Sequence, residues 1–84
     1  MALVTVYVRP GCHLCDVALG DLRELRSEQD FSLDVVDIES DDVLHTRYLE
    51  RIPVIALDGR ELYDFAVDAA DLSLRLRTVE SSQR

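Results

Sequence analysis

Two cysteines separated by two residues are the side chains of this sequence best suited to chemistry. Cys12 and Cys15 stand where an apolar run closes with Pro10-Gly11 and a helical pattern begins. At the start of a helix, unpaired backbone N–H groups and the helix dipole favour a thiolate over a thiol. We therefore predict that Cys12 is a nucleophile that attacks a disulfide. Cys15, one turn further in and more enclosed, is then expected to resolve the mixed disulfide.

The same cysteines are compatible with other functions. A closed zinc site takes four ligands, and the chain offers only Cys12, Cys15, His13 and His45. An iron–sulfur cluster shared across a dimer, or an interaction domain with inert cysteines, are further alternatives. We favour redox chemistry because this spacing beside a strand–helix–strand pattern is typical of redox motifs. Arg9 and His13 would add positive charge near Cys12, and we expect His13 to tune the thiol rather than act as a general base.

Four short apolar runs predict β-strands. They cover residues 3–8, 31–38, 53–57 and 62–65. Pro53 opens the third strand, where a missing N–H is tolerated. Asp58-Gly59 is a strong signal for a hairpin turn between the last two strands.

Three segments carry helical patterns. The first follows Cys12 and breaks at residues 27–30, the second begins at residues 40–42 and stops before Pro53, and the third is capped by Asp68. The apolar stripe of the first helix is Leu14, Val17, Ala18, Leu22 and Leu25, and that of the third is Ala69, Leu72, Leu76 and Val79. Residues 81–84 are expected to form a frayed tail.

The order of these elements, βαβαββα, predicts the fold class. A helix that joins the first two strands makes them parallel, whereas the hairpin makes the last two antiparallel. We expect an α/β fold with a four-stranded mixed sheet and helices on both faces. Residues 1–84 would form one domain.

The charge of the chain limits its partners. The formal net charge is −8, and all nine basic residues are arginine. Such a chain has no basic surface with which to neutralise phosphates, so we expect neither nucleic acid nor an anionic membrane as a partner. No apolar run approaches the length of a membrane span, and no basic leader precedes the first strand. We expect a cytoplasmic monomer, in a compartment where a close cysteine pair is more often catalytic or metal-binding than structural.

Nearly the whole chain resembles the glutaredoxins, which have a thioredoxin-like fold. Residues 7–15 are similar to their active-site segment, in which a basic residue, here Arg9, stands three positions before the nucleophile. Arg51-Ile52-Pro53 resembles their Thr-Val-Pro loop, whose proline is cis and packs against the cysteine pair. The resemblance implies a dithiol–disulfide oxidoreductase that acts on protein or small-molecule disulfides. The residues then expected to contact substrate are Arg9, Gly11, His13, Leu14, Arg51, Ile52, Pro53 and Asp68.

The resemblance also implies an electron donor. Glutathione is the usual donor of the glutaredoxins, and no cofactor is expected to be bound. Arg9 and Arg51 would attract the glycine carboxylate of glutathione, and Asp68 best matches the family's Asp that receives its amine.

The chain departs from the glutaredoxin pattern at two dipeptides and at Asp68, which is shifted by one residue from the family's Asp. His13-Leu14 stands where Pro-Tyr is usual, and Tyr63-Asp64 stands where Gly-Gly is usual. Asp64 would bring a negative charge to the place of a ligand carboxylate. This replacement favours a flavin-dependent thioredoxin reductase, or a dedicated protein, as the electron donor. The chain looks most like the small glutaredoxin-like proteins of bacteria.

Overall fold

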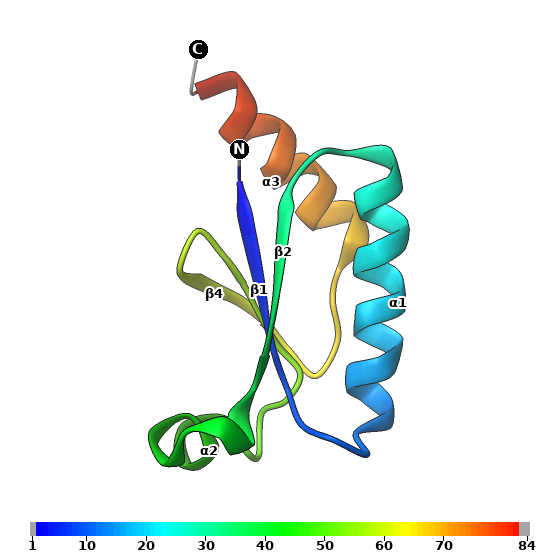
Figure 1. Ribbon diagram of the computed structural model, residues 1–84. Helices are drawn as coiled ribbons and strands as arrows, with labels where there is room; N and C mark the ends of the chain where they lie inside the picture. The colour runs from blue at the N-terminus through cyan, green and yellow to red at the C-terminus, as the bar shows by residue number, and fades with distance from the viewer. Residues whose placement is uncertain (1, 83–84) are drawn as a thin grey trace.

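The computed structural model describes the backbone of residues 2–82 and the side chains of residues 2–78 (Figure 1). The elements follow one another in the predicted order. They are β1 (Leu3–Val8), α1 (His13–Glu28), β2 (Ser32–Asp37), the 3₁₀ helix η1 (Ile38–Ser40), α2 (Asp42–Tyr48), β3 (Val54–Leu57), β4 (Arg60–Asp64) and α3 (Ala69–Ser82).

The four strands form one mixed sheet in the order β2-β1-β3-β4. β1 and β2 are parallel, with Leu3 opposite Ser32 at one end and Val8 opposite Asp37 at the other. β3 is antiparallel to both β1 and β4. The predicted α/β fold class and strand directions are therefore confirmed.

Helices cover both faces of this sheet (Figure 1). α1 and α3 pack on one face of the sheet. Alternate residues of the two central strands, β1 and β3, point toward these helices. This larger core contains Val4, Val6, Leu22, Leu25, Ile55, Leu57, Leu72 and Leu76. α2 packs on the opposite face, where the ring of Tyr48 stacks on that of Tyr7 with centroids 4.4 Å apart. Since successive residues of a strand point to opposite faces, β1 contributes to both cores.

The buried face of α1 differs from the predicted stripe. Leu14 and Val17 are 50% and 49% exposed, whereas the buried residues of this helix are Cys15, Ala18, Leu22 and Leu25. These four recur at the three- and four-residue spacing of one helical face. Cys15 takes the inward position at the start of the helix, so Leu14 and Val17 flank the face and reach solvent.

Other element boundaries also differ from those expected. β2 covers Ser32–Asp37 within the predicted 31–38, and β3 begins at Val54, one residue after Pro53. α1 ends at Glu28, inside the predicted break at residues 27–30, and is capped by Gln29. β4 begins at Arg60, because Asp58 and Gly59 both have positive φ and form a two-residue turn that sets Arg60 opposite Leu57.

The last helix extends further than predicted. It reaches Ser82, so residues 81–82 belong to α3 and not to a frayed tail, while residues 83–84 lie outside the described residues. Leu72 and Leu76 are buried as predicted, but Ala69, in the first turn, is exposed. The predicted packing of Val79 lies outside the described side chains.

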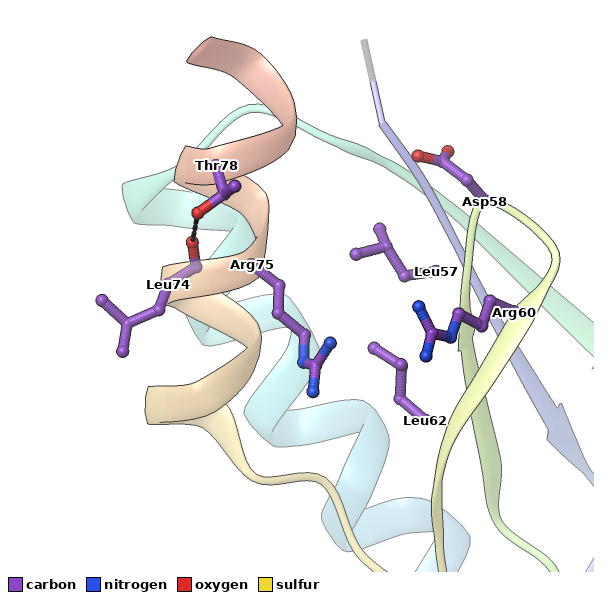
Figure 2. A pocket seen from close by; sticks show the side chains of 7 residues that line it. All are labelled: Leu57, Asp58, Arg60, Leu62, Leu74, Arg75 and Thr78. Atoms are coloured by element: carbon purple, nitrogen blue, oxygen red, sulfur yellow. Dashed lines mark hydrogen bonds between the residues drawn. The ribbon is translucent and has the colours of Figure 1, made fainter. Parts of the chain in front are cut away.

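The two ends of the sheet differ in what surrounds them. The chain enters α1 where β1 ends, and a cleft opens between α3 and the β3–β4 hairpin near the other end of β1 (Figure 2). Within residues 2–82, none of the helices combines the length and apolar character that crossing a membrane requires.

The corrected face of α1 predicts how two substitutions affect stability. Leu22→Ala removes a fully buried side chain between α1 and the sheet, so we expect the free energy of unfolding to fall by about 2–5 kcal/mol. Val17→Ala changes an exposed position and should stay within about 0.5 kcal/mol of the parent. Urea denaturation followed by circular dichroism measures both. Equal losses in the two variants would contradict this assignment of the buried face.

Candidate active site

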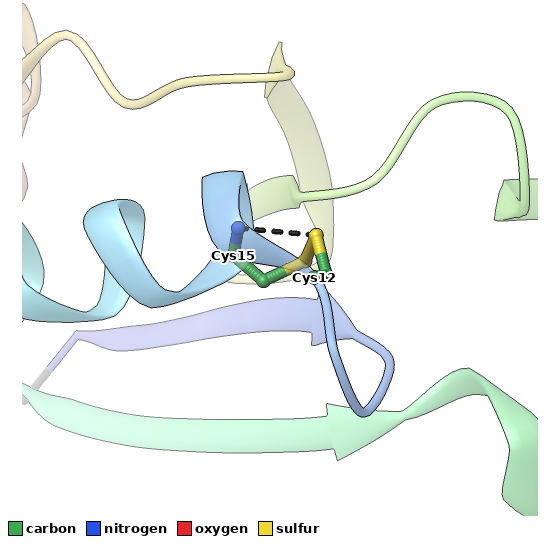
Figure 3. Close-up of a disulfide and its surroundings, with 2 residues drawn as sticks. All are labelled: Cys12 and Cys15. Atoms are coloured by element: carbon green, nitrogen blue, oxygen red, sulfur yellow. Dashed lines mark hydrogen bonds between the residues drawn. A yellow bond between two sulfur atoms is a disulfide. The ribbon is translucent and has the colours of Figure 1, made fainter.

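Cys12 and Cys15 form a disulfide at the start of α1 (Figure 3). Their Cα atoms are 5.2 Å apart, within the usual range for such a bond. Cys12 is the N-cap of the helix, with φ −88° and ψ 108°, and its sulfur accepts the backbone N–H of Cys15 at 3.1 Å. The N–H group that approaches this sulfur is one of those that a helix start leaves unpaired.

The two sulfur-bearing residues differ in exposure. Cys15 is 1% exposed and faces the interior, whereas Cys12 is partly exposed. A molecule in solution can therefore reach Cys12 but not Cys15. This asymmetry is the one that the sequence predicted for a nucleophile and a resolving thiol.

Gly11 joins β1 to this helix start. Its φ is +78°, in the left-handed region where a side chain is disfavoured, although a Cβ built there would meet nothing within 4 Å. Glycine is favoured at this position because of its backbone conformation, and not because a side chain would clash with its surroundings. Gly11 thus sets the path of the chain from Val8 to Cys12.

The side chains around the cysteines point outward. His13 and Leu14 are exposed. Arg9 reaches Glu39, with Nη2 and Oε1 3.4 Å apart and both side chains about two-fifths exposed. The positive charge expected near Cys12 is therefore partly offset by a carboxylate.

The Ile52–Pro53 peptide bond is cis, as the resemblance implied. Pro53 is fully buried and precedes β3, whose first residue, Val54, pairs with Tyr7 near the end of β1. The loop therefore lies at the end of the sheet that carries the disulfide. The backbone N–H of Phe65 donates to the carbonyl oxygens of Pro53 at 2.8 Å and of Arg51 at 3.3 Å, which ties the loop to the end of β4.

Arg51 makes ion pairs with two residues of β4. Its Nε and Nη2 donate to the two carboxylate oxygens of Asp64 at 3.1 and 3.0 Å, and Nη2 also reaches Oε1 of Glu61 at 2.7 Å. Both acidic partners therefore come from β4 and not from the neighbouring Glu50. The negative charge of Asp64, expected to oppose a ligand carboxylate, is balanced by Arg51.

Tyr48 extends this network into the smaller core between α2 and the sheet, where it is buried with Ile38 and Val54. Its hydroxyl donates to Oε2 of Glu61 at 2.7 Å. Burial, and then this hydrogen bond, raise the pKa of Tyr48 to about 12. The hydrogen bonds from Tyr48 and Arg51 hold the pKa of Glu61 below its usual value, although burial opposes them. Glu61 is therefore an ionised acceptor that joins α2, the proline loop and β4.

Asp68 and Phe65 lie between β4 and α3. Asp68 caps α3 as predicted, since its Oδ1 accepts the N–H of Asp71 at 3.0 Å. Phe65 was not singled out from the sequence. It is 51% exposed and has φ +70°. Aromatic residues rarely adopt this conformation, so the sequence offers no reason to expect it here.

Metal ligands were the main alternative for the cysteines. Among the residues that the structure describes, no three His, Cys, Asp or Glu side chains gather as a metal site would require.

Comparison with known proteins identifies related sequences. A model of the glutaredoxin-like domain (DUF836) matches residues 3–77. An uncharacterised protein of Mycobacterium tuberculosis is 33% identical over 70 residues, which covers 77% of this chain and 72% of that protein.

Solved structures are similar as well. A Nitrosomonas europaea protein has 31% identity and a TM-score of 0.77, covering 89% of this chain and 91% of that one. A protein from X. campestris has 37% identity and a TM-score of 0.72, covering 89% and 96%. A Halobacterium salinarum thioredoxin variant, at 16% identity and a TM-score of 0.68 with 92% and 73% covered, shows the shared fold alone.

The position of Glu61 predicts a pH-dependent loss of stability. Its pKa is lowered in the folded state, so its contribution is present above its ordinary pKa and is lost as the pH falls through the folded value. We expect Glu61→Gln to lower the free energy of unfolding by about 1 kcal/mol at pH 7. The difference from the parent should shrink below about pH 4.5.

Glu50→Gln is the matched control, because it removes the same charge from an exposed residue that belongs to none of the ion pairs. Urea midpoints measured from pH 7 to pH 3 compare the two variants. A loss in Glu50→Gln as large as that in Glu61→Gln would refute the specific role of Glu61.

Proposed function

This chain belongs to the glutaredoxin-like domain family (DUF836), and from that membership we propose that it is a dithiol–disulfide oxidoreductase. A glutaredoxin-like thioredoxin fold with a Cys-x-x-Cys pair supports a redox role. The proposed substrates are disulfides of proteins or small molecules. Cys12 is the proposed nucleophile and Cys15 the proposed resolving thiol.

One observation carries this proposal. Cys12 is partly exposed, its sulfur caps α1 and accepts a backbone N–H, and the cysteine bonded to it is buried. After reduction, the same N–H group and the helix dipole favour the thiolate of Cys12. Thiols in such positions titrate between roughly 3.5 and 7.5, below the ordinary value of a free cysteine.

The proposed reaction balances with two thiols and one disulfide. The thiolate of Cys12 attacks one sulfur of the substrate disulfide, which forms a mixed disulfide and releases the other substrate sulfur as a thiolate. Cys15, once deprotonated, attacks the sulfur of Cys12 and releases the second substrate thiolate. The substrate gains two electrons and two protons, and the protein is left with the Cys12–Cys15 disulfide.

The proline loop is the proposed docking element. A proline has no N–H to obstruct a neighbouring chain, and the main chain of Ile52, which precedes it, is the proposed partner of an extended substrate segment. The hydrogen bonds from Phe65 and the ion pairs of Arg51 support this role, because they tie the loop to β4. Leu14 and Phe65, both exposed, are the proposed apolar contacts.

The electron donor is either glutathione or a flavin-dependent thioredoxin reductase. Arg51 already binds Asp64 and Glu61, and Asp68 already caps α3. These engagements leave fewer free groups for glutathione and favour a protein donor. The proposed compartment is the cytoplasm, whose reducing systems would return the disulfide to the dithiol.

A coupled assay tests the activity. Oxidation of NADPH is followed on a model disulfide, with glutathione and its reductase in one reaction and thioredoxin reductase in another. We expect turnover with thioredoxin reductase to exceed that with glutathione, and Cys12→Ser to reduce either rate to the background. Turnover with neither donor, or full turnover in Cys12→Ser, would contradict the proposed function.

The roles of the two cysteines are tested separately. Cys15→Ser keeps the nucleophile but removes the resolving thiol, so the mixed disulfide should accumulate with an aromatic model disulfide. Intact-protein mass spectrometry should show one substrate thiol added to Cys15→Ser and none to Cys12→Ser. Stable labelling of Cys12→Ser at Cys15 instead would reverse the proposed roles.

A further inference from the structure

A cleft between α3 and the β3–β4 hairpin lies apart from the disulfide (Figure 2). Its volume of about 420 Å³ falls within the range of small-molecule sites. Leu57 and Leu62 extend from the hairpin toward α3 and give the cleft an apolar wall. The N–H of Asp58, at the tip of this hairpin, bonds to the carbonyl of Leu3, whereas Cys12 follows the opposite end of β1.

Two arginine side chains face each other across this cleft, Arg60 from β4 and Arg75 from α3 (Figure 2). Among the described side chains, Arg60 has no acidic partner. Arg75 donates its Nε proton to Asp71 at 2.7 Å, and its guanidinium extends into the space toward Leu62. Because the carboxylate of Asp71 offsets the charge of Arg75, Arg60 is the cation whose charge an anion in the cleft would balance. The guanidinium of Arg75 can add hydrogen bonds to the same anion.

The acidic residues nearby are engaged with donors of the protein. Oδ1 of Asp58 accepts the N–H of Leu3 at 2.9 Å, and Figure 2 shows this side chain directed away from both arginines. Asp71 accepts hydrogen bonds from the hydroxyl of Tyr63 and from Arg75. Asp58 is part of the cleft lining, but because its side chain points away from Arg60 (Figure 2), an external anion can approach Arg60 on the side that faces Arg75.

We propose that this cleft binds a small monocarboxylate that carries an aliphatic chain. The carboxylate lies between Arg60 and Arg75, whose planar guanidinium groups match its geometry, and the chain lies against Leu57 and Leu62. Since a cavity of about 150 Å³ holds benzene, 420 Å³ admits a chain of roughly eight carbons. A polyanion would need a wide basic surface, and the net charge of −8 provides none.

Octanoate is the probe for this site, with two compounds that each lack one half of the ligand. ¹⁵N-labelled protein is titrated and followed by amide and arginine Nε chemical shifts. We expect octanoate to give saturable shifts at Arg60, Arg75 and Thr78, which line the cleft. Acetate, which lacks the chain, and 1-octanol, which lacks the charge, should each bind at least about tenfold more weakly.

Arg60→Gln is expected to weaken octanoate at least about tenfold, because it removes a charged hydrogen bond at an exposed position. Arg23→Gln is the matched control, since Arg23 is exposed on α1 and is not in the cleft lining. Shifts that do not saturate, that map to the Cys12 end of the protein, or that are unchanged in Arg60→Gln would each overturn the proposal. Equal affinity for 1-octanol would do so as well, because the site would then not recognise an anion.

Discussion

The hydrogen bond from the Cys15 N–H to the Cys12 sulfur depends on how the chain passes from β1 into α1. Gly11 adopts a positive φ that directs the backbone into the first turn, and Cys12 becomes the N-cap. Caps are usually hydroxyl, carboxamide or carboxylate side chains. Here a sulfur takes the place of that oxygen. The atom that accepts a backbone N–H at the start of the helix is therefore also one of the two sulfurs of the disulfide. Replacing Cys12 would for that reason alter both the helix cap and the proposed redox chemistry.

A second constraint holds the proline loop, which lies at the end of the sheet that carries the disulfide. Arg51, Glu61, Asp64 and Tyr48 form a network that connects α2, the proline loop and β4. The network neutralises charges that would otherwise face a ligand, and Arg9 is likewise paired with Glu39. The surroundings of the disulfide are therefore less charged than their composition indicates. Main-chain and apolar contacts are what remain for a substrate, which agrees with the proposed docking to Ile52.

The two ends of β1 have different surroundings. One end carries both the disulfide, which follows β1, and the proline loop, which precedes the neighbouring strand β3. At the other end, α3 and the β3–β4 hairpin enclose an apolar cleft with arginines on both sides. The core between these ends is continuous, because Leu72 and Leu76 of α3 pack with Val4 and Val6 of β1.

Local patterns determined much of this protein from the sequence alone. The order of the elements, the parallel and antiparallel pairs, the Asp58-Gly59 turn and the cysteines at a helix start all follow from signals within a few neighbouring residues. The cis form of Ile52–Pro53 was implied only by resemblance, because local physics favours trans for most such bonds.

Only the tertiary structure decided which side chains meet. The pairing of β3 with β4 brings Glu61 and Asp64 to Arg51, a contact that periodicity along the chain does not reveal. The inward position of Cys15 turned Leu14 and Val17 toward solvent, because one helical face has room for only part of a broad apolar stripe. The cleft between Arg60 and Arg75 likewise exists only where two distant elements lie side by side. Long-range packing determines these features, and a sequence pattern describes only neighbours along the chain.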